Sequence, residues 1–530
     1  MPWTAVLAIL VVWGVLAHGF RPTALYVESR RLPPLQASPL GSSPANVQVK
    51  AHALDLIQNL SESAIRGRGT EAGLESMVKL SQMCAERLPF DFDDDDVESF
   101  KSDEQTVISK LPCLLPAGIT NQIFEKVEGM LQRGWLSTNP DSVDGLPSFH
   151  LNLVSNGKPI ASGENLDDFQ VEIQSMLDLV GPLVYDKLLP HVKEQLKSDS
   201  IEVSDVFIRR YGHDIVEGKS RNGISAHYDV FSRVTSVVAL DDVAQEGRNG
   251  LYTTVQQFSD KSHGARTSNH AALRRFFPLG VGDAVVHTWN VLHGVDVEEG
   301  IDRASLIVWF TEKTTDNDFV SPSWLENHPN LESDNVAQFV LASATESSEP
   351  APGEGSLSMN QGVDKQIGGL AKAIDLYLSS AASGNSFAMT RLGSLLEEGL
   401  LDAPALETAR DILSDLRQSR TNDIPAWVED QNDASISLAR GFWYEASLCG
   451  NALAQIALAD EIMASFSAEP DARLLAATLF GLAAQQGNEQ AVESLTRLVQ
   501  LDLQFSGVSS QEEFETNPVV QTARAATRLL

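Results

Sequence analysis

Hydrophobic and polar residues alternate in several short runs between Val107 and Phe319, and turn-forming Gly, Asp and Asn residues separate these runs. Alternation with a period of two is typical of β-strands that bury one face. The clearest runs are Val206–Arg210, Val234–Ala239, Ala284–Thr288 and Ser305–Thr311. Many short strands with turns between them predict a β-sandwich or a β-barrel in this part of the chain.

Two helices are expected in the first half of the same region. They are Gly118–Arg133 and Leu166–Ser198. The second helix contains Pro182 and Pro190, and we expect it to break at one of them because proline lacks the N–H group that continues a helix.

The C-terminal part is rich in Ala and Leu, and a Gly-Asn pair recurs in it at Gly384-Asn385, Gly450-Asn451 and Gly487-Asn488. Glycine favours the left-handed position that ends a helix. This pattern over residues 366–505 resembles the Sel-like, tetratricopeptide-related α/α repeat. The glycine spacings are 66 (450 − 384) and 37 (487 − 450) residues, so either one repeat is degenerate or an insertion intervenes. An ordinary helical bundle with glycine caps is the alternative.

The remaining segments are expected to be leaders, linkers and a tail. The apolar run Ala5–Ala17 predicts a signal peptide over residues 1–19, although no Lys or Arg precedes it. Residues 20–50 begin with Phe and are basic, which resembles the transit peptide of proteins sent to secondary plastids. The alternatives are the endoplasmic reticulum lumen, or a signal anchor left uncleaved. Residues 51–106 predict a helical segment and an acidic linker, 320–365 a linker and 506–530 a tail.

The amino-acid composition of the chain restricts the kinds of partner and site that it can have. The 530 residues include 39 Lys and Arg against 72 Asp and Glu, a formal net charge of −33, which argues against a nucleic-acid partner. The apolar N-terminal run is short for a membrane span, so we expect no stable span in the mature chain. The three cysteines, Cys84, Cys113 and Cys449, are too few and too widely spaced for a disulfide framework or a thiolate zinc site.

A candidate metal-binding pair lies in Ile224–Asp229, where one residue separates His227 from Asp229. Side chains two positions apart on a strand share a face, so both can point into a barrel. His293 follows 66 residues later (293 − 227) and offers a third ligand. Two imidazoles and one carboxylate form the ligand set of Fe(II) oxygenases and leave three coordination positions open.

Arg303 follows His293 by ten residues (303 − 293) and is expected on a strand. The same face of that strand would carry Arg303, Ser305, Ile307 and Trp309, while Ala304, Leu306, Val308 and Phe310 pack outward against another layer. A buried Arg has to be paired, and its guanidinium fork suits a carboxylate. We expect Arg303 to bind the distal carboxylate of 2-oxoglutarate, with a further hydrogen bond from Ser305.

His227-x-Asp229, His293 and Arg303-x-Ser305 together resemble the 2-oxoglutarate/Fe(II)-dependent dioxygenase superfamily. The neighbouring motifs are similar to its prolyl 4-hydroxylase branch, over roughly residues 110–312. These motifs are Arg210-Tyr211, Gly282-Asp283 and the series His293, Val297, Gly300, Arg303 and Trp309.

The resemblance implies an all-β double-stranded β-helix, or jelly roll, with flanking helices over residues 107–319. It implies Fe(II), 2-oxoglutarate and O₂ as cofactors and allows for ascorbate. His227, Asp229 and His293 would be the catalytic metal ligands, and Arg303, Ser305 and Tyr211 would bind 2-oxoglutarate. The implied reaction hydroxylates a prolyl or other protein side chain while 2-oxoglutarate is converted to succinate.

Some features depart from the pattern. The stretch from Tyr211 to His227 is longer than usual, which argues against Tyr211 as a contact of 2-oxoglutarate. Arg303 stands where collagen-type enzymes usually have Lys, which favours the oxygen-sensing type or other relatives. His287 is a rival ligand, but its 16-residue spacing to Arg303 (303 − 287) fits less well. We expect His213, His263 and His270 to be solvated.

Three functions compete. The first is a peptidyl-proline hydroxylase, or a relative acting on a protein or peptide substrate that the C-terminal repeats recruit. The second is a non-catalytic helical-repeat scaffold with a vestigial barrel. The third is an oxygenase of small molecules or nucleobases, and the net charge of −33 disfavours nucleobases.

Overall fold

The computed structural model describes residues 88–92, 107–162, 166–216, 219–254, 274–298, 300–312, 322–347, 359–418, 434–468, 470–507, 511–517, 519–520 and 523. The predicted signal and transit peptides lie outside these residues, as do most of 51–106, the side chain of His213, and His263 and His270. Among the described residues, no helix is both long and apolar enough to cross a membrane.

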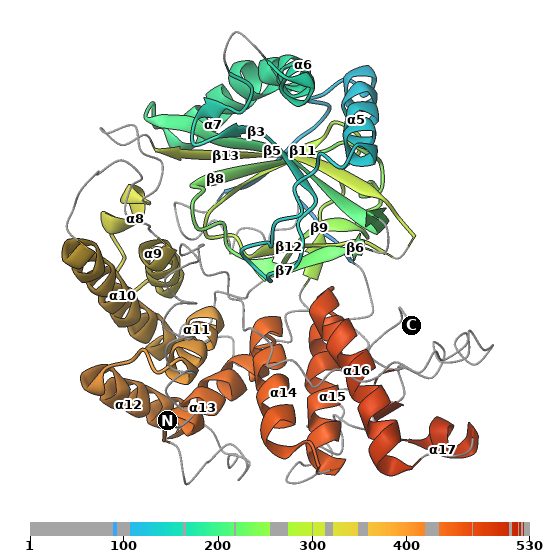
Figure 1. Cartoon of the computed structure of the whole chain (residues 1–530). Coiled ribbons are helices and arrows are strands. Elements are labelled where there is room, and N and C mark those ends of the chain that lie inside the picture. Colours follow the sequence, from blue (N-terminus) through green and yellow to red (C-terminus); the bar gives the residue numbers. More distant parts are fainter. Residues whose placement is uncertain are drawn as a thin grey trace, which may run out of the picture.

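Two β-sheets face each other in one half of the molecule (Figure 1). The larger sheet runs β2 (Ile108–Leu111), β11 (Ala284–Thr288), β8 (Val234–Ala239), β13 (Arg303–Glu312), β5 (Ile201–Val216), β3 (His150–Ser155), β4 (Lys158–Pro159), and β6 (Lys219–Arg221) pairs with β5. The smaller sheet runs β1 (Leu88–Pro89), β10 (Arg274–Phe276), β9 (Gly250–Thr254), β12 (His293–Asp296), β7 (Gly223–His227). The described pairs are antiparallel apart from β1 with β10. The predicted sheet-rich core is confirmed.

Strand β13 shows why the larger sheet forms. Ala304, Leu306, Val308 and Phe310 lie in one buried apolar cluster with residues of the covering helices α5 (Ala117–Gln132), α6 (Asp168–Leu183) and α7 (Leu189–Leu196). The alternate residues Ile307 and Trp309 face the space between the sheets. The predicted division of this strand into an outer and an inner face is therefore confirmed.

The second predicted helix is interrupted, as expected, near its prolines. Pro182 lies inside α6, a π-helical turn η2 (Val184–Leu188) follows, and Pro190 lies in the first turn of α7. The backbone stays helical throughout, and the π-helical turn lies directly before Pro190, which has no N–H to donate to the preceding turn.

Helices make up the C-terminal half (Figure 1). They are α8 (Ser323–Glu326), α9 (Asn335–Ser347), α10 (Met359–Ala382), α11 (Ser386–Glu397), α12 (Ala403–Gln418), α13 (Ala434–Leu448), α14 (Ala452–Phe466), α15 (Pro470–Ala484), α16 (Glu489–Ser506) and α17 (Gln511–Thr516). Each recurring Gly-Asn pair lies between two of these helices, with Gly384, Gly450 and Gly487 at positive φ. Helix α12 lies in the long interval between the first two pairs, so that interval holds an additional helix.

The helices pack directly against the outer face of the smaller sheet. Tyr252 and Phe276 of that sheet belong to the same buried cluster as Tyr377 of α10 and Phe387 of α11. The two halves therefore share one apolar core.

Three predicted boundaries are wrong. Residues 320–365 are not simply a linker, because α9 and the start of α10 form there and α9 buries most of its apolar side chains. Leu88–Pro89 forms a strand rather than part of a helical segment, and Phe90 enters the core between the sheets. The predicted C-terminal tail contains the short helix α17.

Candidate metal centre and cofactor pocket

The three predicted metal ligands lie together at one end of the smaller sheet. His227 ends β7 and His293 begins β12, and the two residues are directly paired in the sheet. Asp229 lies just beyond β7, with its carboxylate 3.9 Å from His227 Nε2 and 3.5 Å from His293 Nε2. The ligand atoms of all three lie within 4.8 Å of one another. The expectation that His227 and Asp229 share a strand is wrong, because the strand ends at His227 and a loop brings Asp229 to the same point.

Hydrogen bonds to backbone carbonyls orient both imidazoles. His227 Nδ1 lies 2.8 Å from Ser225 O, and His293 Nδ1 lies 3.0 Å from Val291 O. A carbonyl can only accept, so Nδ1 carries the proton and the lone pair of Nε2 is free to bind a metal. Thr235 donates to the Asp229 carboxylate at 2.5 Å and holds it in place.

The surroundings favour the protonation states that a metal requires. Burial, together with the neighbouring His293, lowers the pKa of His227 to about 4. Burial opposes ionisation of Asp229, but the adjacent His293 and His227 lower its pKa overall. The site therefore presents a neutral His227 and a carboxylate at neutral pH, which is the form in which these side chains bind metals.

A β-bulge explains how His227 reaches the interior. His293 pairs with His227, but Val295 pairs with Ile224, so one residue of β12 faces two of β7. Ile224 lies in the inner core, whereas Ala226 lies in the outer core shared with the helices. Bulges change the direction of side chains in this way and are common near active sites.

Arg303 lies on the larger sheet and is fully buried, with an exposed fraction of 0%. Its Nε, Nη1 and Nη2 atoms have no hydrogen-bond partner among the described residues. Burial lowers its pKa, against the opposing effect of Asp241 and Tyr211. A side chain at Gly250 would collide with the guanidinium, so the glycine is needed to leave room for it. An unpartnered buried guanidinium is costly, and a ligand carboxylate would satisfy it.

Tyr211 and Ser305 lie beside this guanidinium. Tyr211 pairs with Arg303 across β5 and β13, and Ser305 is two residues further along the same face. Burial raises the pKa of Tyr211, which keeps its phenol protonated and able to donate. The described residues between Tyr211 and His227 form the end of β5, then β6 and β7.

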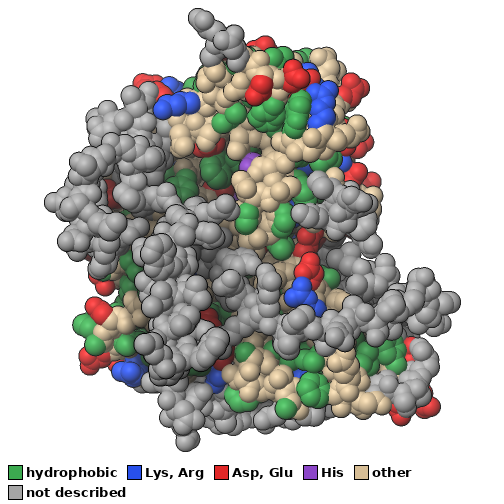
Figure 2. Space-filling view, in the orientation of Figure 1, with side chains coloured by type: hydrophobic (Ala, Val, Ile, Leu, Met, Phe, Trp, Pro, Cys, Tyr) green, Lys and Arg blue, Asp and Glu red, His purple; other side chains and the backbone are tan. Residues whose placement is uncertain are grey.

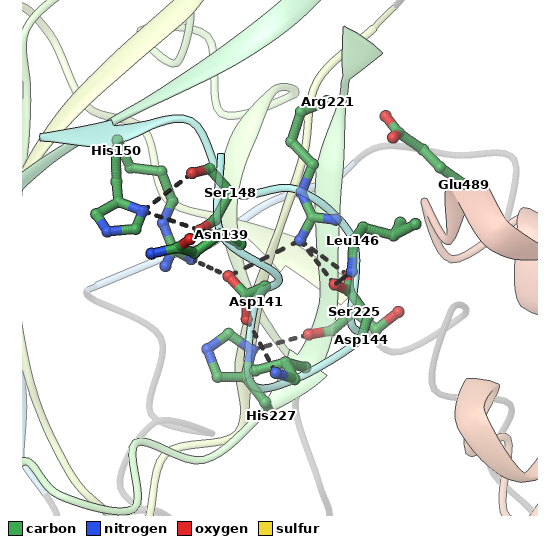
Figure 3. Close-up of polar contacts among 12 residues, drawn as sticks. Asn139, Asp141, Asp144, Leu146, Ser148, His150, Arg221, Ser225, His227 and Glu489 are labelled. Atoms are coloured by element: carbon green, nitrogen blue, oxygen red, sulfur yellow. Dashed lines mark hydrogen bonds and ion pairs between the residues drawn. The ribbon is translucent and has the colours of Figure 1, made fainter. Parts of the chain in front are cut away.

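Four charged residues beside the metal centre were missed by the sequence reasoning (Figure 3). In the loop between α5 and β3, Asp141 pairs with Arg209 at 2.9 Å. In the same loop, Asp144 accepts two hydrogen bonds from Arg221 at 2.9 and 3.0 Å. Both carboxylates are buried, and burial raises the pKa of Asp144 despite Arg221. These residues come from distant segments, and no local pattern marks them.

His287, the rival ligand, is buried against the centre without joining the three ligand atoms. Its ring centroid lies 4.3 Å from that of His293, and its Nδ1 lies 3.2 Å from Thr288 O. Burial lowers its pKa to about 3, so it is neutral.

No protein-family model matches the chain, and no curated protein matches it. Several solved structures are similar to it in part. An alpha-ketoglutarate-dependent epimerase from nogalamycin biosynthesis is 14% identical, covering 41% of this chain and 83% of its own, with a TM-score of 0.28. An oxidoreductase of the 2OG-Fe(II) oxygenase family from Burkholderia pseudomallei is 13% identical (42% and 95% covered, TM-score 0.28). A Pseudomonas putida prolyl-4-hydroxylase is 14% identical (41% and 100% covered, TM-score 0.26).

Proposed function

We propose that this protein is an Fe(II)- and 2-oxoglutarate-dependent oxygenase with a jelly-roll catalytic domain, which hydroxylates a prolyl or other side chain of a protein substrate. The observation that supports this most is the pair of sites that face one interior. An imidazole–carboxylate–imidazole set lies at one end of the smaller sheet, and a buried guanidinium without a partner among the described residues lies on the larger sheet.

The side chains have separable roles in this proposal. His227, Asp229 and His293 would hold Fe(II) and leave positions open for the 2-oxo acid and O₂. Arg303 would bind the distal carboxylate of 2-oxoglutarate, with hydrogen bonds from Tyr211 and Ser305. With O₂ as the co-substrate, bound iron and 2-oxoglutarate would supply the chemistry that replaces C–H by C–OH: one oxygen atom would enter the hydroxyl group and the other the succinate that forms with CO₂. The apolar residues between the sheets would exclude water from this reaction.

The net negative charge of the chain and its C-terminal helices indicate which class of substrate to expect. On the face shown in Figure 2, the described Lys and Arg side chains do not gather into a patch, which disfavours a nucleic-acid substrate. A protein or peptide recruited by the C-terminal helices is the proposed substrate. Entry into the secretory pathway, and from there into a plastid or the endoplasmic reticulum lumen, stays a prediction of the N-terminal sequence.

The test is a succinate-release assay on purified protein with a panel of proline-containing peptides, beside a direct anaerobic titration with Fe(II). We expect Fe(II) binding, and succinate production that requires Fe(II), O₂ and 2-oxoglutarate. If the purified protein binds no Fe(II), the oxygenase proposal is refuted and the non-catalytic scaffold is the remaining function. Release of succinate that no peptide stimulates, but that small molecules do, would contradict the protein-substrate part alone.

A further inference from the structure

Three asparagines in the C-terminal half begin helices in the same way. Asn385, Asn451 and Asn488 are the N-caps of α11, α14 and α16, and each side-chain oxygen accepts from a backbone N–H of the first turn at 3.0–3.1 Å. This is the usual role of an N-cap asparagine. Their side-chain nitrogens, in contrast, have different partners.

The first two asparagines donate within the helical half. Asn385 donates to Asn335 O at 3.3 Å, and Asn451 lies 3.5 Å from Ser386 Oγ. Asn488 instead donates across to the smaller sheet, to Ser225 Oγ at 3.0 Å. Both partners are buried, with exposed fractions of 1% for Asn488 and 2% for Ser225.

Ser225 is the residue that orients the metal ligand His227. Its carbonyl accepts from His227 Nδ1, as drawn in Figure 3, while its hydroxyl accepts from Asn488. Ser225 and Ala226 form the bulged pair of β7 that faces Gly294. A bulged residue lacks the regular ladder bonds that fix its neighbours, so an additional contact has more influence there than in regular strand.

Further contacts hold the same turn of α16 against the end of β7 that precedes the bulge, and α11 supports the other end. The Glu489 carboxylate accepts from the Asn222 N–H just before β7, and in Figure 3 it lies on the helix beside the sheet. A side chain at Gly487 would touch Asp296 of β12 at 3.4 Å. On the far side of His227, the Tyr228 ring packs against Phe387 of α11 at 5.4 Å.

We propose that Asn488 is a positioning residue for the metal centre: through Ser225, the N-terminal turn of α16 fixes the β7 bulge and thereby the direction of the His227 imidazole. The identity of the metal rests on the proposed function, whereas the positioning itself does not. The C-terminal helices then form part of the scaffold of the site, in addition to any role in recruiting a substrate.

The chain offers a matched pair of variants. In Asn488→Ser the serine is still a good N-cap residue, but its side chain is too short to reach Ser225. Asn451→Ser makes the same change at a buried N-cap whose described hydrogen bonds stay within the helical half. Ser225→Ala removes the contact from the other side and leaves α16 unaltered. Each protein would be titrated anaerobically with Fe(II), and its β7 backbone amides would be followed by hydrogen exchange without metal.

We expect Asn488→Ser and Ser225→Ala each to weaken Fe(II) binding by about 10-fold, the lower end of the effect of removing outer partners of metal ligands. Exchange at Ser225–His227 should become faster in both. The double variant should be no worse than either single one, because both remove the same bond. Asn451→Ser should bind Fe(II) like the parent protein.

Equal Fe(II) affinity in Asn488→Ser and Asn451→Ser would overturn the proposal, as would fully additive effects of the two single changes. If Asn488→Ser does not fold, Ser225→Ala decides the question alone. Parent protein that binds no Fe(II) would refute the proposed function, and the exchange rates of β7 would still show whether Asn488 holds the bulge.

Discussion

The two sheets differ in what covers them, and the strand that carries Arg303 is more regular than the strand that carries His227. Strand β13 of the larger sheet alternates along most of its length, and α5, α6 and α7 cover its outer side. Strand β7 of the smaller sheet is bulged, and C-terminal helices cover its outer side. Arg303 comes from the regular strand and His227 from the bulged one. The position of Arg303 follows from the regular alternation of its own strand. The position of His227 depends also on contacts with the C-terminal helices, which are distant in the sequence.

The largest expected effect tests the smaller sheet. His293→Ala should weaken Fe(II) binding by more than about 100-fold, because it removes a ligand rather than a supporting group. The control is His287→Ala, which removes an adjacent buried imidazole that is not among the three ligands. Anaerobic Fe(II) titration measures both. Similar losses in the two variants would mean that His287 takes part in binding the metal.

Arg303 tests the larger sheet. Arg303→Ala should weaken 2-oxoglutarate binding by about 10- to 100-fold, since it removes a buried charged hydrogen-bond donor, while Fe(II) affinity changes little. Calorimetric titration of each ligand separates the two effects. Equal loss of both affinities would show that Arg303 has a structural role.

The unpartnered Arg303 guanidinium should also affect the free energy of unfolding. Without a ligand, Arg303 is buried and unpartnered among the described residues, so Arg303→Met should leave the ligand-free protein as stable as the parent or more stable. Added 2-oxoglutarate should stabilise the parent and not the variant. Urea unfolding with and without 2-oxoglutarate measures this. A clear loss of stability in ligand-free Arg303→Met would indicate a partner within the chain.

The two coverings can be compared by removing one buried side chain from each. Leu306→Ala under α5–α7 and Phe387→Ala in α11 should each lower the free energy of unfolding by about 2 to 5 kcal/mol. Only Phe387→Ala, which removes the support of Tyr228, should also weaken Fe(II) binding. Equal Fe(II) affinities in the two folded variants would show that the coverings are equivalent.

The smallest expected effect concerns pH. Burial raises the pKa of Glu489 to about 7, despite the opposing Asn222 N–H and Arg221. The folded protein therefore holds this proton more tightly than the unfolded chain, and stability is lost as the pH rises from about 4.5 to 7. Relative to Glu489→Gln, the parent should lose about 1 to 3 kcal/mol over that window. Glu407→Gln, a change at an exposed carboxylate of α12, is the control for urea unfolding across pH.

Much of the candidate site could be predicted from the sequence, because a few residues in a distinctive order are enough to suggest a metal site and a carboxylate-binding Arg. The pairing of His227 with Asp229, and Arg303 on an alternating strand, restrict the possibilities more than any single residue does. The folded chain pairs His293 with His227 and Tyr211 with Arg303. The predicted linker at 320–365 is wrong at α9, because the Ser, Glu, Pro and Gly residues of this segment follow a mostly apolar run, Val336–Ala342, that packing against the rest of the protein buries as a helix.

The sequence by itself determined which residue types could hold a metal and a carboxylate, and the faces of β13, because a strand's period of two is a local property. Tertiary structure decided the rest. Asp229 reaches the centre from a loop, Asp141 and Asp144 meet Arg209 and Arg221 from another segment, and Asn488 contacts the bulge from 263 residues away. Such contacts follow from how packed elements meet in space, and no pattern of neighbouring residues records them.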